Sequence, residues 1–489
     1  MMNTNKFLKL FFLLIIPLFL LGATLLVIII TQGGQVTDKG IVNDKGVIRI
    51  FTDPLNISCT VYIDNKQISL QNNNSVNIDS GEYLVRLEAE NFVTWEKKVI
   101  VSKGIVNDIY AKLFSNKLAL TKLTSANVSK IFFSQSGEYL FYVVTDSQFP
   151  QDLGIWKLQL GSNSFTLFNQ GQKQMKFYDI STPTISNIIN STYDIIPSND
   201  GNRILLTDIK NQQFLVISNQ QNTNVDSTGI LDISLKLGFT PQSVKWMNNF
   251  NSLLISQDKS IFEYNLSNSI VTLIRLTEDK TPIYSSNNTQ ILVFDSEKKV
   301  LSSYKNQLLE SILPNVAFPE NVQNIYLASN NNRFLFLQTS TSFVLFDLEK
   351  YSYYDMAILD EQLLTISSDG SSLIFIDKNN KVLSKNIKEN IVANKLEITT
   401  SFFDTSYTDI NSIKFITQSS LILLQNKKDG FIYAYDKDGT NKIKLLDNTN
   451  IVSGFDFDND GNELYVLLVD ETTSQNINTS NIYKVSLNK

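Results

Sequence analysis

The chain has 489 residues, a formal net charge of −6 and no histidine. Its 43% hydrophobic and 11% aromatic residues, against 18% charged ones, are typical of a folded protein and exclude a disordered one. Without histidine, the commonest general base and the commonest transition-metal ligand are missing. The single cysteine, Cys59, excludes an intrachain disulfide. Lys and Arg are scattered singly, so no basic stripe predicts nucleic-acid binding.

An apolar run stands near the amino terminus. Residues 10–30 are interrupted only by Pro17, Gly22 and Thr24. At about 1.5 Å per residue, this run is long enough to cross a bilayer core of about 30 Å. A cleaved signal peptide is the alternative, but its apolar region is usually shorter and is followed by small residues. We therefore expect an uncleaved transmembrane anchor in contact with the lipid bilayer.

The charges beside this run predict its orientation. Lys6 and Lys9 precede it without an acidic residue, whereas the charges after it cancel. The positive-inside rule then places residues 1–9 in the cytoplasm and everything after residue 30 outside, in a single-pass protein of the cell membrane. Residues 31–45 are polar and rich in glycine, which is typical of a flexible spacer.

Residues 46–114 alternate short runs of strand-forming residues with turns. Six or seven strands in so short a segment predict a small β-sandwich. The turn Asp64-Asn65-Lys66 suits a tight hairpin. The expected strands are 47–51, 59–63, 75–78, 83–89, 94–101 and 106–113.

This segment resembles a PEGA domain, a small sandwich of microbial surface proteins. The matching residues are Pro54 after the first strand, Val61-Tyr62-Ile63-Asp64, Gly81-Glu82-Tyr83, Phe92 and the closing strand that ends at Leu113. Two features depart from the family pattern: Leu55-Asn56-Ile57 follows Pro54 in place of Glu-Gly-Ala, and Asn91 stands where a glycine usually precedes the aromatic. We expect Trp95 and Phe92 to be core residues rather than a ligand platform.

Residues 115–489 contain eight copies of one pattern, in which a short strand, a polar turn and a strongly apolar strand follow one another. Repeats of about 40 to 50 residues are typical of the four-stranded blades of a β-propeller. The turn carries glycine in four copies, where the chain needs a positive φ to reverse. The copies begin at Ile131, Ile195, Val244, Ile283, Ile325, Leu364, Ile413 and Phe455.

The last two copies, with Asp436-Lys437-Asp438-Gly439 and Phe455 to Val466, resemble TolB-like and WD-repeat-like propellers. The fold class is thus all-β: an anchor, a sandwich and an eight-bladed propeller. Seven blades are the alternative, if the Ile283 copy is an insertion. We predict that residues 118–123 form the outer strand of the blade that begins at Phe455, and so close the ring with strands from both ends.

The triplet Asp456, Asp458 and Asp460, followed by Gly461, spells the first half of a calcium loop. The second half is missing, since Leu467 stands where a bidentate Glu is needed. A hairpin turn is the simpler interpretation, so we expect no metal and no cofactor. Asp436 to Gly439 has the same ambiguity.

No catalytic motif stands out, and histidine-based triads are impossible. We therefore expect a binding or scaffold protein of the cell envelope rather than an enzyme, with a protein or surface polysaccharide as partner. The alternative is a carboxylate-based hydrolase or lyase that acts on carbohydrate or peptide at the mouth of the propeller channel. A cluster of inward-facing acids with raised pKa values would favour this enzyme. Residues 169–191 and 388–408 are the longest linkers and the expected ligand-contacting loops.

Overall fold

The computed structural model describes two compact units, Met1–Leu118 with Asn488–Lys489, and Ala119–Leu487. It describes residues 15–24, 27 and 35–487, the last range without 38–39, 43–44, 56, 71–73, 126, 135–136, 146–149, 161–173, 180–192, 209, 220–228, 248–250, 279–281, 288–289, 314–316, 359–360, 391–394, 417–420, 447–450, 458–460 and 472–477.

Residues 15–24 of the predicted anchor are helical and exposed, and residues 10–14, 25–26 and 28–30 lie outside the described part of the chain. Over the described residues, no helix has both the length and the apolar character needed to cross a membrane. In the predicted spacer, β1 (Gln35–Thr37) pairs with β2 (Gly40–Val42). The sequence did not reveal this hairpin, because three-residue strands have no readable alternation.

The rest of the first unit consists of two sheets, as predicted. One has the strand order β6-β3-β9, with β3 and β9 parallel, and the other has the order β5-β4-β7-β8. The inward positions form a core around Trp95, which is fully buried. The strands are β3 (Lys45–Asp53), β4 (Cys59–Ile63), β5 (Lys66–Ile68), β6 (Ser75–Asp79), β7 (Gly81–Ala89), β8 (Trp95–Val101) and β9 (Val106–Lys112).

Turns in this unit have left-handed backbones at Asn and Asp residues. Asp64 and Asn65, between β4 and β5, have φ of 47° and 64°, as a tight hairpin requires. Asn91 has φ of 64°. A glycine is common at this family position because it adopts such a conformation without strain, and Asn is one of the few residues that tolerates it. Cys59 is half-buried, and burial raises the pKa of its thiol.

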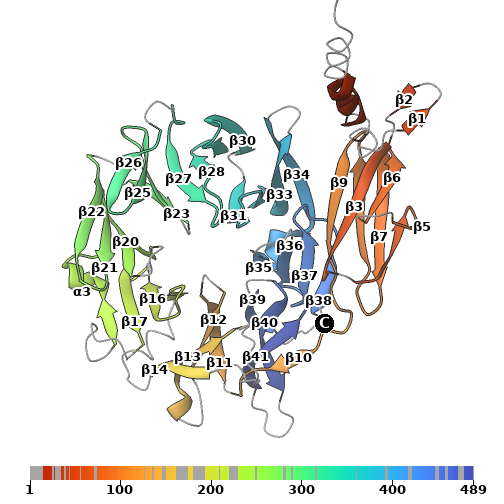
Figure 1. The fold of residues 1–489 in the computed structure, drawn as a ribbon. Helices are drawn as coiled ribbons and strands as arrows, with labels where there is room; N and C mark the ends of the chain where they lie inside the picture. The colour runs from red at the N-terminus through yellow and green to blue at the C-terminus, as the bar shows by residue number, and fades with distance from the viewer. Residues whose placement is uncertain are drawn as a thin grey trace, which may run out of the picture. The chain divides into compact units, whose positions relative to one another are not determined.

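The second unit is built from four-stranded antiparallel sheets that follow one another around a ring (Figure 1). In the described residues there are eight of them, and each sequence copy supplies the two innermost strands of one sheet. The Ile283 copy also forms a complete sheet, so it is not an insertion into a neighbour.

The first four sheets run from β11 to β26. Their strands are β11 (Val128–Phe133), β12 (Tyr139–Val144), β13 (Gly154–Gln159), β14 (Gln174–Tyr178); β15 (Asp194–Pro197), β16 (Arg203–Asp208), β17 (Gln213–Ser218), β18 (Ile230–Asp232); β19 (Ser243–Trp246), β20 (Ser252–Gln257), β21 (Ser260–Asn265), β22 (Val271–Leu276); β23 (Ile283–Ser286), β24 (Ile291–Asp295), β25 (Val300–Lys305), β26 (Leu308–Ser311).

The next three sheets run from β27 to β38, and the last combines both ends of the unit. Their strands are β27 (Val322–Leu327), β28 (Phe334–Thr339), β29 (Ser342–Asp347), β30 (Ser352–Ile358); β31 (Gln362–Ile366), β32 (Ser372–Ile376), β33 (Lys381–Asn390), β34 (Lys395–Ser406); β35 (Ile410–Phe415), β36 (Leu421–Asn426), β37 (Ile432–Asp436), β38 (Ile443–Leu446); β39 (Ile451–Phe457), β40 (Glu463–Glu471), β41 (Asn478–Ser486) and β10 (Leu120–Lys122).

The predicted closure of the ring is confirmed. The last sheet has the order β10-β41-β40-β39, so its outermost strand comes from the start of the unit and the other three from its end. Leu120 pairs with Val485, and the Leu123 N–H donates to the Ile482 carbonyl at 2.8 Å. The Thr124 hydroxyl extends this contact, since it accepts from the Ile482 N–H at 2.9 Å.

Apolar side chains of neighbouring sheets form the core. One cluster joins Phe141 and Ile155 of one sheet to Ile204 and Ile217 of the next. Phe343 packs edge-on against Phe375 across another junction, with ring centroids 5.2 Å apart. Aromatic residues of the repeats belong to this core: Tyr142, Trp246, Phe334, Phe346 and Phe375 are buried, and Phe132, Phe133, Trp156 and Tyr433 are partly buried.

The prediction of a loop is wrong for residues 388–408, and for residues 169–191 it is wrong where β14 lies. Most of residues 388–408 belong to β33 and β34, whose pairing continues from Lys381–Ser406 to Asn390–Lys395. Residues 169–191 contain β14, and the remainder of that stretch lies outside the described residues. The short helix α3 (Ile233–Leu237), capped by the Asp232 side chain, was also not predicted; the 3₁₀ turns are η1 (Pro150–Asp152) and η2 (Tyr407–Asp409).

Candidate functional site

The innermost strands face the centre of the ring (Figure 1). Over their described residues they carry two carboxylates, Asp194 and Asp456, and three lysines, Lys130, Lys245 and Lys414. Their other side chains are apolar groups, hydroxyls and amides. No group of three or more acidic or cysteine side chains in the described residues lies close enough together to hold a metal ion.

Three of these charged groups contact a neighbouring inner strand. Lys414 Nζ donates to Asp456 Oδ2 at 2.7 Å, which joins β35 to β39. Lys245 Nζ lies 5.1 Å from the centroid of the Tyr284 ring on the next inner strand. The Tyr284 and Ser243 hydroxyls are 2.6 Å apart. These contacts stabilise the inner wall, and they offer no nucleophile paired with a base.

The predicted metal candidates are only partly described. Asp456 is bound to Lys414, while Asp458 and Asp460 lie outside the described residues. The related turn from Asp436 to Gly439 uses its carboxylates locally. Asp438 accepts from the Thr440 N–H at 3.2 Å, and Gly439 has φ of 76°, which fits a strand-connecting turn.

Two of the turns between the innermost strand pairs have the same form. In Ser198-Asn199-Asp200-Gly201, the Ser198 hydroxyl donates to the Asp200 carboxylate at 2.6 Å, and the glycine has φ of 62°. Ser367 to Gly370 repeats both features, with 2.6 Å and 70°. Gly137 and Gly461 have φ of 67° and 64°, so all four predicted turn glycines adopt a left-handed backbone.

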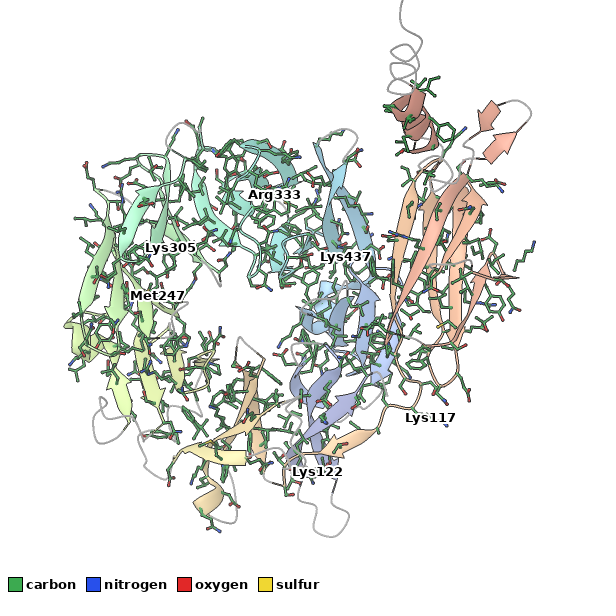
Figure 2. All side chains as sticks on the ribbon, in the orientation of Figure 1. Lys117, Lys122, Met247, Lys305, Arg333 and Lys437 are labelled. Atoms are coloured by element: carbon green, nitrogen blue, oxygen red, sulfur yellow. The ribbon has the colours of Figure 1, made fainter. Side chains whose placement is uncertain are left out.

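Hydrogen bonds connect these turns from sheet to sheet. Each bond runs from a side chain of one sheet to the inner turn of a neighbour. In the described residues these bonds span five of the eight junctions between sheets, and we call the set the turn ring. Its described bonds are Lys157 Nζ to the Gly201 carbonyl at 2.6 Å, Arg203 Nη1 to Asn251 at 2.9 Å, Asn287 Nδ2 to the Ala328 carbonyl at 3.1 Å, Asn331 Nδ2 to the Asp369 carbonyl, and Lys437 Nζ to the Ser371 hydroxyl at 3.3 Å. Figure 2 labels Lys437.

The β33–β34 hairpin extends beyond its sheet at the same end as the turn ring. Strand directions alternate within a sheet, so the turn from the third strand to the fourth lies on the same face as the turn from the first to the second. Four residue pairs, from Ile387–Ile398 to Asn390–Lys395, form the extension. Ile387 and Leu396 are buried in a cluster with Met356 of the adjacent sheet, while Lys388, Lys395 and Glu397 are exposed.

An ion-pair cluster around Arg333 fixes this hairpin. Arg333, labelled in Figure 2, binds both oxygens of the buried Asp347 carboxylate. It also lies 3.4 Å from Glu389 on the hairpin, and Lys350 Nζ lies 2.8 Å from the same carboxylate. Networks of this kind hold geometry better than isolated surface pairs do. The hairpin is therefore a positioned element rather than a free loop.

The described carboxylates with shifted pKa values all have lowered ones. Burial alone would raise the pKa of Asp347, but hydrogen bonds from Arg333 and from the Glu349 and Lys350 amides outweigh it and hold the pKa below its usual range. The same balance lowers the pKa of Asp295, beside Arg275, and of Asp369 in the turn ring. The raised carboxyl pKa values that would mark an acid catalyst are not found in the described residues.

The geometry defines an all-β protein with a small sandwich and a ring of four-stranded sheets. Residues 45–116 match the PEGA domain family, which confirms the resemblance seen in the sequence. The match covers the sandwich, including the residues after Pro54 and at Asn91 that depart from the family's sequence pattern. A search of curated proteins gave no match.

Solved structures similar to this chain are propellers. The WD40 domain of SCAP from fission yeast has a TM-score of 0.41 and 11% identity, over 76% of this chain and 98% of that one. The Cps50 propeller of Myceliophteria thermophila has 0.40 and 8%, over 76% and 100%. Streptogramin B lyase has 0.35 and 16%, over 60% and 93%. At such scores these likenesses carry no argument about what this chain does.

Proposed function

We propose that the protein is a membrane-anchored binding or scaffold protein of the cell envelope, whose second unit is an eight-bladed β-propeller. The observation that carries this proposal is the β33–β34 hairpin. It extends past its sheet, exposes Lys388, Lys395 and Glu397, and is held by Arg333 and Lys350. A rigid projection presents a contact surface without a large entropy loss on binding. The partner is a protein or a surface polysaccharide.

The composition of the inner strands supports binding over hydrolysis. A carboxylate-based hydrolase or lyase needs two acids with separated pKa values. Asp194 and Asp456 are the carboxylates of the described inner strands, and Asp456 is paired with Lys414. Side chains that make hydrogen bonds and apolar contacts, with no acid pair, suit a surface for recognition.

In-cell crosslinking and capture of the full-length protein tests the function. In the test variant, Lys388→Glu and Lys395→Glu reverse two exposed charges on the hairpin. In the matched control, Lys236→Glu and Lys305→Glu reverse two exposed charges elsewhere on the second unit. We expect the captured partner to be lost with the hairpin variant and kept with the control. Equal capture by both would contradict the hairpin as binding element, and turnover of a polysaccharide by the wild type would favour the enzyme.

The proposed anchoring has its own test, which uses the single native cysteine. In a Cys59→Ser background, Leu55→Cys places a thiol at a side chain that is 77% exposed, and Asn3→Cys places one before the apolar run. A membrane-impermeant maleimide should label Leu55→Cys in intact cells and Asn3→Cys only after lysis. Labelling of both in intact cells, or of neither, contradicts this topology.

A further inference from the structure

Exposed apolar side chains of the sandwich gather around one turn. The turn between β8 and β9 has Ile100 before it, Ile105 in it and Val106 after it, and these side chains are 72%, 51% and 38% exposed. The other large apolar side chains exposed in the described residues of the sandwich are Leu55 and Tyr110. Single exposed apolar residues need no explanation, but a group of them marks a site of interaction.

The two strands beside this turn belong to different sheets. The strand β8 is the edge of the order β5-β4-β7-β8, and β9 is the edge of the order β6-β3-β9. Val101 and Ile109 are buried in the core, so by alternation Ile100 and Val106 point outward from their sheets. Apolar side chains therefore flank the turn on both sides. We call Ile100, Ile105 and Val106, together with the turn, the apolar tip.

The apolar tip lies at the end of the sandwich where the chain enters it from the spacer. The Gly104 N–H donates to the Lys45 carbonyl at 2.9 Å, and the Val47 N–H donates to the Ile105 carbonyl at 2.9 Å. These bonds hold the turn against the first residues of β3. Leu55 follows the other end of β3, which is about 26 Å away at about 3.3 Å per residue.

The length of chain between the proposed anchor and β3 limits how far the apolar tip lies from the membrane. The apolar run ends at residue 30, and β3 begins at Lys45. The pairing of Gln35 with Val42 in the β1–β2 hairpin shortens this link. The two remaining stretches span at most about 28 Å at about 3.5 Å per residue, and the paired strands add about 5 Å. A tether of about 33 Å gives the tip a high effective concentration at the bilayer, so that a weak contact is enough.

The charges at this end of the sandwich do not oppose contact with a bilayer. Glu82 of β7 lies 3.8 Å from Lys98. Asp79 is opposite Lys45 where β3 pairs with β6. Lys103, in the turn itself, is exposed. Since neither sign of charge dominates, burial of the apolar side chains is the driving force, and neutral lipid suffices.

We propose that the apolar tip docks on the bilayer that holds the anchor, with Ile100, Ile105 and Val106 at the boundary between headgroups and acyl chains. The docking rests on the proposed membrane anchoring. At that boundary the three side chains lose contact with water, as the apolar face of an interfacial helix does. The sandwich then stands on the membrane by its β8–β9 turn, and does not move freely on the spacer.

Quenching by lipid tests this contact, with full-length protein in phosphatidylcholine vesicles and a Cys59→Ser background. A fluorophore on Ser102→Cys reports from the exposed turn, and one on Leu55→Cys reports from the far end of β3. Bromine atoms on the acyl chains quench only a fluorophore that reaches them. We expect brominated lipid to quench most of the emission from Ser102→Cys and none from Leu55→Cys. Adding Ile100→Ser and Ile105→Ser should remove the quenching.

Flotation of the same samples with the vesicles separates the docking from the anchoring on which it rests. If the protein floats but both labels are quenched alike, or neither is quenched, the anchor stands and the docking is overturned. Quenching that persists in the double serine variant also overturns it, as does a blue shift of the Ser102→Cys label without quenching, because protein would then cover the turn. Protein that does not float contradicts the anchor and the docking together. If the double serine variant fails to fold, the comparison of the two labels decides.

Discussion

Gly370, in one of the turns of the turn ring, adopts a backbone conformation that the sequence predicts. Gly370 has φ of 70°, and a Cβ there would lie 3.1 Å from the Ala328 Cβ. Gly238 has a similar φ of 75° with open space around it. We expect Gly370→Ala to destabilise the second unit by about 2 to 3 kcal/mol and Gly238→Ala by about 1 kcal/mol. Calorimetry on both variants checks this; equal losses would show that the contact with Ala328 is unimportant.

Asn91 in the PEGA domain also has a left-handed backbone conformation. Because its φ is 64°, a β-branched residue there is strained, whereas glycine is not. Asn91→Val should lower the free energy of unfolding of the first unit by about 1 to 2 kcal/mol, and Asn91→Gly should leave it almost unchanged. Thermal unfolding separates the two outcomes. Equal stability of the Val and Gly variants would contradict the role given to this backbone angle.

The carboxyl group of Asp347 makes the stability of the second unit depend on pH. Its pKa is lower in the folded protein than in the unfolded chain, where it is about 3.9. The stabilisation is therefore complete above that value and is lost as the pH falls below about 4. Asp347→Asn should lower the melting temperature at pH 7 and flatten its decline between pH 5 and pH 3. The exposed Asp355→Asn is the control, and parallel curves for wild type and Asp347→Asn would contradict the account.

Among the elements, β10 has the clearest structural task. The Leu123 N–H faces β41, so by alternation the Thr121 N–H does too, while the Leu120 N–H faces the free edge. Thr121→Pro removes a ladder hydrogen bond and should cost about 1 to 3 kcal/mol, whereas Leu120→Pro should cost less. Melting temperatures of the two full-length variants test this. Equal destabilisation would mean that β10 does not close the ring by strand pairing.

Elements with strongly apolar strands were predicted from the sequence, and elements held by polar contacts were not. The eight inner strand pairs stand out because their second strands are almost wholly apolar, as in Leu253-Leu254-Ile255. The extension of β33–β34 is different: its outward positions are Lys388, Lys395 and Glu397, and the partners of its buried positions lie on the adjacent sheet. A sequence read along one strand does not show such partners. The sequence hid the turn ring for the same reason, since its bonds join residues 38 to 66 positions apart in the chain.

At the scale of the molecule, the repeats led from the sequence to the ring. A four-stranded sheet with two apolar faces has to stack on neighbours, and closure covers the faces that a linear stack would leave exposed. The order β10-β41-β40-β39 provides that closure. The exposed residues of the outer surface were harder to predict from the sequence, because the exposure of Val271 and Leu273 depends on which strand of the sheet is outermost. Alternation alone marks both residues simply as strand-forming.

The proposed function assigns a closed ring of eight blades to the second unit, and electron microscopy of single particles in detergent tests this ring most directly. Projections along the axis of the second unit should show eight spokes without a break between the first and last sheets. Seven spokes, or an open ring with a gap beside β10, would contradict the account.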